Sequence, residues 1–173
     1  MPVFIALLRA VNVGGTGKLP MADLKRLCEA AGFRAVRTVG ASGNVVAERD
    51  GGEAEAKAAL EAALKAYAGK PVDVLVRSGA EMAAVLANNP FPDAAPNRTV
   101  AVFVDAPLGP DALDSAAGQG DEEMRLGVRE IYIHYPKGMG RSKLRIPAAR
   151  NGTARNINTI ATLARLAGET RRS

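Results

Sequence analysis

The stretch VRTVGASGNVVAE, Val36–Glu48, decides the fold, because two short β-rich runs flank a Gly/Ser turn and so predict a β-hairpin. A helix is predicted on each side of it: Pro20–Phe33, with proline in the first turn and a glycine stop, and the alanine-rich Glu53–Gly69. Farther out, the apolar runs Val3–Val11 and Pro71–Arg77 predict buried strands. The order is therefore βαββαβ, which is the order of a ferredoxin-like module.

A second series of the same kind follows. Residues 81–87 predict a short helix, and a strand is predicted at 98–105 after a Pro/Asn-rich linker. A short helix at 109–118, two strands within 122–136 and a helix over 153–168 complete the order βαββα. The sequence thus predicts an α+β protein of two tandem ferredoxin-like (α/β plait) modules. The predicted bounds are 1–87 for the first module, 88–98 for the linker, 99–168 for the second module and 169–173 for a disordered tail.

Composition limits the class of protein. With 173 residues, 47% of them hydrophobic and 24% charged, the chain is typical of a soluble globular protein. Neither a signal peptide nor a membrane span is predicted, and the single cysteine, Cys28, fits a core position in a cytoplasmic protein. His134 is the only histidine, so a His-rich metal site and a Ser-His-Asp triad are not expected.

The segment NVGGTGK invites comparison with a phosphate-binding Walker A loop, G-x-x-x-x-G-K-[ST]. Gly17 and Lys18 fit the end of that pattern, but its first glycine would fall on Asn12 and its metal-binding hydroxyl on Leu19. A nucleoside triphosphatase is therefore not predicted, and a glycine-rich loop with one lysine is left to explain.

Connectivity suggests a role for this loop. In a βαββαβ module the first strand–helix loop, the hairpin turn and the connection after the second helix all lie at one end of the sheet. Lys18, Ser42, Gly43, Asn44 and Lys70 should therefore converge there and form an anion pocket, together with Asn12. The alternative is that these glycines and asparagines serve only their own turns, since both residue types tolerate the left-handed region.

The C-terminal segment carries the positive charge. Pro136–Ser173 holds nine Lys or Arg residues and one acid, Glu169, whereas the rest of the chain has an excess of acids. Such a patch is typical of phosphate recognition, although a solvated helix face and a frayed end would give the same pattern.

The last predicted helix has its own features. Thr153 is the predicted N-cap, and Arg155 in the first turn would suit an anion. For Asn156 the favoured alternative is a structural one, hydrogen bonding to backbone carbonyls.

Several motifs together resemble a known family. ALLRAVNVGGTGKLPMADLKRLCEAAGF, VRTVGASGNVV, NPF, GRSKL and TARNINTIATL look like the bacterial family catalogued as domain of unknown function 1697, over about Val3–Gly168. Ala10 and Ile157 depart from the family pattern, which has Gly and Trp there, and the hairpin lacks the aromatic residues and the glutamine of the pattern. A ligand that stacks on those aromatic residues is therefore not expected here.

The resemblance implies a fold of two ferredoxin-like halves and no established activity, so no catalytic residue carries over. It does carry over a set of polar and glycine positions that match the family pattern and that we treat as candidate ligand-binding residues. These are Arg9, Asn12, Gly14, Gly15, Ser42, Gly43, Asn44, Arg155, Asn156 and Thr159.

Three classes of function stay open. The first is binding of a small anionic or phosphorylated molecule by the first module, with an enzyme on such a molecule as a special case that has no nominated base or nucleophile. The second is weak, salt-sensitive nucleic-acid contact through the basic segment, although NVVAE lacks the aromatic residues on which RNA-binding modules of this order stack bases. The third is a protein-interaction scaffold that uses open sheet faces. No cofactor, metal or membrane partner is predicted, and no oligomeric state is predicted.

Overall fold

The protein is described by a computed structural model over residues 1–11 and 18–172. The chain divides into two compact units, Met1–Ala83 with Thr162–Ser173, and Ala84–Ala161. The elements of the first series are β1 (Val3–Leu8), α1 (Met21–Ala30), β2 (Arg34–Thr38), β3 (Asn44–Glu48), α2 (Glu53–Ala68) and β4 (Val74–Ser78). Those that follow are α3 (Gly79–Ala87), η1 (Pro96–Arg98), β5 (Thr99–Phe103), β6 (Glu123–Leu126), β7 (Glu130–His134), η2 (Pro147–Ala149), β8 (Thr153–Asn156) and α4 (Ile157–Arg172).

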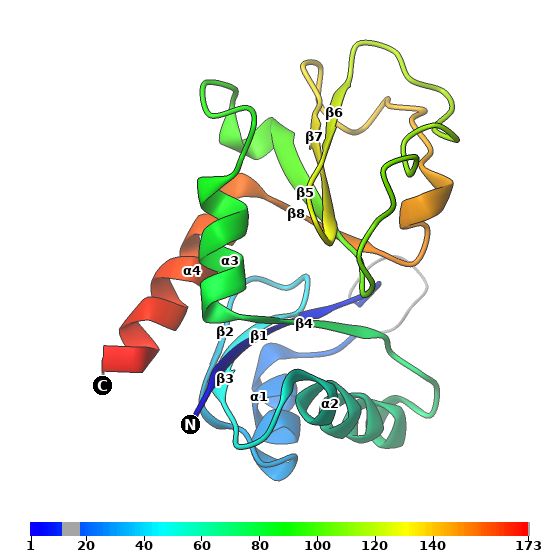
Figure 1. Ribbon diagram of the computed structural model, residues 1–173. Helices are drawn as coiled ribbons and strands as arrows, with labels where there is room; N and C mark the ends of the chain where they lie inside the picture. Colours follow the sequence, from blue (N-terminus) through cyan, green and yellow to red (C-terminus); the bar gives the residue numbers. More distant parts are fainter. Residues whose placement is uncertain (12–17, 173) are drawn as a thin grey trace. The chain divides into compact units, whose positions relative to one another are not determined.

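The first unit contains a four-stranded antiparallel sheet in the order β2-β3-β1-β4. Figure 1 shows α1 and α2 side by side on one face of this sheet. Phe4, Ala6 and Leu8 of β1 pack there against buried residues of the two helices, such as Leu24 and Leu60. The βαββαβ order and its core are therefore those predicted from the hairpin outward.

Local sequence explains where α2 begins and ends. Ala56, Leu60 and Leu64 recur every four residues and form its buried stripe. The Glu55 carboxylate accepts a hydrogen bond from the Gly52 N–H at 2.6 Å and so satisfies one backbone donor before the first turn. Gly69 ends the helix in the left-handed conformation, with φ of 73°.

Cys28 and both faces of β1 are buried in the first unit. Cys28 is fully buried on α1, and burial raises the pKa of its thiol to about 12, so it is a core residue and not a nucleophile at neutral pH. Ile5 and Leu7, which lie on the other face of β1, are also buried.

The second unit repeats the sheet but not the helices. Its four antiparallel strands follow the order β6-β7-β5-β8, which corresponds strand by strand to that of the first sheet. The described residues therefore form a mixed α+β fold of two such sheets and four α-helices, as expected for two tandem ferredoxin-like modules. The prediction of a short helix at 109–118 is wrong, because the chain forms a series of turns there.

The helix predicted from residue 153 begins only at Ile157. Thr153–Asn156 instead forms β8, in which Thr153 pairs with Phe103 and Asn156 with Val100. This strand is the fourth strand that the order βαββα lacked. No helix in the described part of the chain has the length and apolar character needed to cross a membrane.

Candidate functional site

Three chain segments meet at one end of the first sheet, as the connectivity predicted. The Leu8 N–H donates to the Gly43 carbonyl at 2.8 Å, which joins the end of β1 to the hairpin turn. The Arg9 N–H donates to the Asp73 carbonyl at 2.9 Å, which joins the same point to the connection between α2 and β4. These two backbone hydrogen bonds fix the ends of all three segments relative to one another.

A cavity of about 720 Å³ opens at this end of the unit, and we call it the Lys18 cavity. Its described lining combines basic side chains from the β1–α1 and α2–β4 connections with apolar residues. The lining residues are Arg9, Ala10, Val11, Lys18, Leu19, Leu64, Tyr67, Ala68, Lys70, Pro71, Val72 and Asp73. The predicted convergence of Lys18 and Lys70 is thus present in the structure, with Arg9 beside them.

The charges of the cavity do not cancel. Arg9, Lys18 and Lys70 are basic, and Asp73 is the one acid among the described lining residues. Arg9 Nη1 lies 3.9 Å from Asp73 Oδ2, a separation too long for a hydrogen bond, and the Asp73 side chain is 61% exposed. Exposed ion pairs of this kind contribute at most about 1 kcal/mol. The site therefore has a net positive charge.

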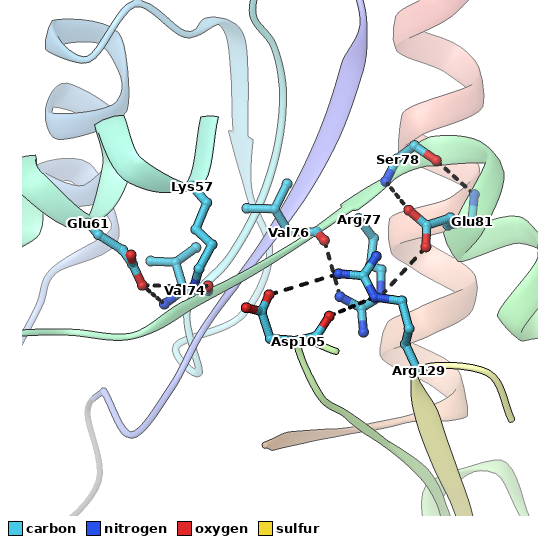
Figure 2. A network of polar contacts seen from close by, with 9 residues as sticks. All are labelled: Lys57, Glu61, Val74, Val76, Arg77, Ser78, Glu81, Asp105 and Arg129. Carbon is cyan, nitrogen blue, oxygen red and sulfur yellow. Dashed lines mark hydrogen bonds and ion pairs between the residues drawn. The ribbon is translucent and has the colours of Figure 1, made fainter. Parts of the chain in front are cut away.

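One wall of the cavity is held by a clamp on β4, which is an edge strand of the sheet. Lys57 Nζ on α2 donates to the Val74 carbonyl at 2.5 Å, and Glu61 Oε2 accepts from the Val74 N–H at 3.0 Å (Figure 2). Lys57 and Glu61 also pair with each other at 2.9 Å. The clamp satisfies both backbone groups of Val74 and so fixes the neighbouring segment 70–73 against α2.

Tyr67 also lines the cavity. It lies in the last turn of α2 and is 46% exposed. Its hydroxyl donates to Asp23 Oδ2 on α1 at 2.8 Å. This hydrogen bond ties the tip of the ring to the other helix and restrains the ring at the rim of the Lys18 cavity.

The hairpin residues lie at the same end of the sheet but outside the cavity lining. Asn44 is buried, and its Nδ2 donates to the Val39 carbonyl at 2.7 Å and to Ser42 Oγ at 3.0 Å. Gly43 adopts φ of 87°, which glycine allows. These contacts match the alternative interpretation, in which Ser42, Gly43 and Asn44 shape their own turn. Asn12, Gly14 and Gly15 lie outside the described residues.

The predicted C-terminal site residues belong to the second unit. Arg155 lies in β8 and is buried, and its Nη1 donates to Thr153 Oγ1 at 2.6 Å and to the Ala154 carbonyl at 2.9 Å. Burial lowers the pKa of its guanidinium to about 10, so it is charged at neutral pH. Asn156 Oδ1 accepts from the Thr159 N–H at 2.9 Å. The N-cap of α4 is therefore Asn156 and not the predicted Thr153, which is three residues too early because β8 intervenes.

Another cavity, of about 410 Å³, lies among the loops of the second unit and is lined by Lys137, Arg141 and Lys143. Its basic residues face acids of the same unit. Lys137 Nζ lies 3.8 Å from Asp121 Oδ2. Hydrogen bonds from Ser142 Oγ, at 2.5 Å, and the Gly120 N–H, at 2.6 Å, lower the pKa of Glu122. The acid charge in this loop cluster makes it a weaker candidate for anion binding than the Lys18 cavity.

Sequence reasoning missed part of the Lys18 cavity. Tyr67, Val72 and Asp73 line it but were not nominated. Their positions in the sequence could have indicated this. Tyr67 lies two residues before Gly69, and Val72 and Asp73 lie within three residues of the nominated Lys70. Among the described residues there is no group of three or more His, Cys, Asp or Glu side chains that could hold a metal ion.

Comparison with known proteins agrees with this architecture. Residues 1–132 match the family described as "Protein of unknown function (DUF1697)", and the chain belongs to that family. A solved structure of conserved bacterial protein SP0830 from Streptococcus pneumoniae is similar, with a TM-score of 0.77 and 23% sequence identity. The match covers 96% of this chain and 98% of that one, so the two proteins share a fold. No curated protein matches the chain.

Proposed function

We propose that the protein binds a small anionic molecule, most favourably a phosphorylated one, in the Lys18 cavity. The observation that carries this proposal is the lining itself, in which Arg9 and Lys18 of the β1–α1 connection and Lys70 of the α2–β4 connection line one cavity of about 720 Å³. Arginine and lysine side chains in a concave site are the usual means of recognising phosphate, because they supply charge-assisted hydrogen bonds. We further propose a cytoplasmic location, which the single cysteine supports.

The loop chemistry supports binding over a Walker A type of triphosphatase. Leu19, at the position where a Walker A loop has its metal-binding hydroxyl, is buried and lines the cavity. The proposal nominates no general base and no nucleophile, so it concerns binding and makes no statement about a reaction.

A binding measurement on Lys18→Ala tests the proposal. The screen that finds a probe is a thermal-shift series with inorganic phosphate, sugar phosphates, nucleotides and short oligonucleotides, because a ligand in excess raises the melting temperature by mass action. Loss of one charge-assisted hydrogen bond costs about 1.5–3 kcal/mol, so calorimetry should show Lys18→Ala binding the selected anion about 10- to 150-fold more weakly. The melting temperature of the free variant should stay near that of the wild type, since Lys18 is exposed.

Lys25→Ala is the matched control, because Lys25 is an exposed lysine on α1 that does not line the cavity. It should bind as the wild type does. Equal weakening in both variants would show that net charge, and not the Lys18 cavity, determines binding.

The second candidate is contact with nucleic acid through the exposed loop residues Lys137, Arg141, Lys143 and Arg145. We expect such contact to be weak and blind to sequence, because an exposed loop offers charge to phosphates but no surface for reading bases. Fluorescence anisotropy with single-stranded oligonucleotides should show log affinity falling with log salt by about 0.7 per phosphate contacted. Binding that prefers one sequence and persists in physiological salt would place this function above anion binding.

A further inference from the structure

We infer that the ligand of the Lys18 cavity is a phosphate monoester with a planar, largely apolar body, of the size and chemistry of a mononucleotide. This inference rests on the proposed function and narrows it from anions in general to one class. Three properties of the lining lead to it: volume, net charge and the division between polar and apolar walls.

Volume argues against a bare anion. At about 720 Å³ the cavity falls within the range of about 300–1,000 Å³ that is typical of pockets for drug-sized ligands. Inorganic phosphate or sulfate would occupy a small part of this space and leave the apolar wall in contact with water. A ligand that fills the cavity carries a body besides its charged group.

Charge argues for one phosphate group. The charged residues of the described lining, Arg9, Lys18, Lys70 and Asp73, sum to a net charge of +2. A phosphate monoester carries about −1.5 to −2 at pH 7, which matches this value. A nucleoside triphosphate would bring more negative charge than these side chains neutralise, and the Leu19 side chain has no hydroxyl to coordinate the metal ion that accompanies a triphosphate in a Walker A loop.

The remaining lining suits a planar body. Leu19, Leu64 and Val72 are among the lining residues, and Val72 is half-buried, so the lining has an apolar part. Tyr67 adds an aromatic ring whose hydroxyl is tied to Asp23, so the ring is already restrained for stacking. Stacking of a base on an aromatic side chain strengthens binding by about 5- to 150-fold.

Asp73 supplies a hydrogen-bond acceptor for the sugar or the base of such a ligand. As a carboxylate it accepts hydrogen bonds and donates none, and it is 61% exposed, so ligand groups can reach it. Sugar hydroxyls and the exocyclic amines of bases are donors that a carboxylate can bind, whereas a second phosphate would be repelled. Cations for the phosphate, an acceptor for the sugar or base and an apolar wall for the base therefore occur in one cavity.

Calorimetry with four probes tests the inference on the full chain: inorganic phosphate, ribose 5-phosphate, adenosine 5′-monophosphate and adenosine. The mononucleotide should bind about 5- to 150-fold more tightly than ribose 5-phosphate, and adenosine should bind more weakly than the mononucleotide, because stacking and charge each contribute. Tyr67→Ala should abolish the advantage of the mononucleotide over ribose 5-phosphate. Tyr67→Phe keeps the ring and should retain most of that advantage, which separates stacking from the hydrogen bond to Asp23.

The outcomes distinguish the inference from the proposed function. If ribose 5-phosphate and the mononucleotide bind equally, and Lys18→Ala weakens both, anion binding stands and the inference about the apolar body is wrong. If Tyr67→Ala and the wild type discriminate equally, the ring does not contact the base and the inference is also wrong. If none of the phosphate-bearing probes binds, the proposed function and the inference fail together.

Discussion

Gly43 is held in the hairpin turn by both its backbone conformation and its surroundings. Its φ of +87° belongs to the left-handed region, and a Cβ placed on it would lie 2.8 Å from both Leu8 Cβ and Val11 Cγ2. The residue therefore faces a conformational restriction and a steric one at the same time. Because the Gly43 carbonyl also accepts from the Leu8 N–H, the turn and the end of β1 move together.

We predict that Gly43→Val destabilises the protein by about 2–5 kcal/mol, because left-handed backbone costs an L-residue about 1–2 kcal/mol and forcing extra atoms into packed surroundings costs about 1–3 kcal/mol more. Gly40→Val is the matched control, since Gly40 also has positive φ, at +64°, but a Cβ on it would have no other atom within 4 Å. It should lose only about 1–2 kcal/mol, the cost of the backbone conformation alone. Urea unfolding measures both, and equal losses would show that the contact with Leu8 and Val11 relaxes without cost.

The sequence predicts where such residues lie better than it predicts what their side chains do. Asn44 and Asn156 are both candidates for ligand binding, because asparagine has the donors and acceptors that a ligand needs. In the structure the Asn44 amide holds its own turn and the Asn156 carbonyl oxygen caps a helix. Both uses are local, and the choice between a local partner and a ligand depends on backbone geometry that a residue type does not specify.

At the scale of elements, the main departure from the prediction is the start of α4. TARN does not show the alternation of apolar and polar residues typical of a strand, and its buried residue is Arg155. Thr153–Asn156 forms a strand because it pairs with β5, and this pairing between distant parts of the chain cannot be seen in the local sequence. Gly152 allows the close approach just before it, since a Cβ there would lie 2.5 Å from the Phe103 carbonyl oxygen.

The revised helix start gives a prediction for Asn156. Asn156→Ala removes the acceptor for the Thr159 N–H and should cost about 1 kcal/mol of unfolding free energy. Asn156→Asp retains an accepting oxygen, and its charge is favourable at a helix N-terminus, so it should keep most of the stability. Thermal unfolding of the two variants measures the difference. Equal losses for alanine and aspartate would mean that the contribution of Asn156 comes from its place in β8 and not from the cap.

The elements of the first unit were predictable for simple reasons. A turn between two β-rich runs defined the hairpin, and α2 showed a buried residue every four positions together with a glycine stop. The second unit was harder to predict, because turns replace the helix expected at 109–118 and β8 takes the place of the expected first turn of the last helix. The helix predicted at 109–118 rested on the helix propensity of an alanine-containing run, but the chain forms turns there.

At the scale of the whole molecule, the net charge of +5 is less informative than its location. The basic C-terminal segment accounts for the excess, yet Lys137, Arg165 and Arg155 of this segment contact oxygen atoms of nearby residues. The three basic residues of the Lys18 cavity are scattered through a part of the chain whose own balance is acidic. Connectivity, not composition, indicated that Lys18 and Lys70 would meet.

The positions of the loop ends could be predicted from the sequence, but the cavity lining could not. The order βαββαβ placed the loop ends at one side of a sheet, and the backbone hydrogen bonds of Leu8 and Arg9 confirm that placement. It could not indicate which side chains border an open space there, because that depends on how Tyr67 and the clamped segment before Val74 fill the volume between the elements. The cavity lining is therefore a finding of the structure.

A crystal structure of the protein grown with adenosine 5′-monophosphate tests the central claim most directly. We predict a phosphate group in the Lys18 cavity, with its oxygens within about 3 Å of the ammonium groups of Lys18 and Lys70, as charge-assisted hydrogen bonds require. Phosphate bound instead among Lys137, Arg141 and Lys143, or a Lys18 cavity that holds only water while the nucleotide binds in solution, would contradict it.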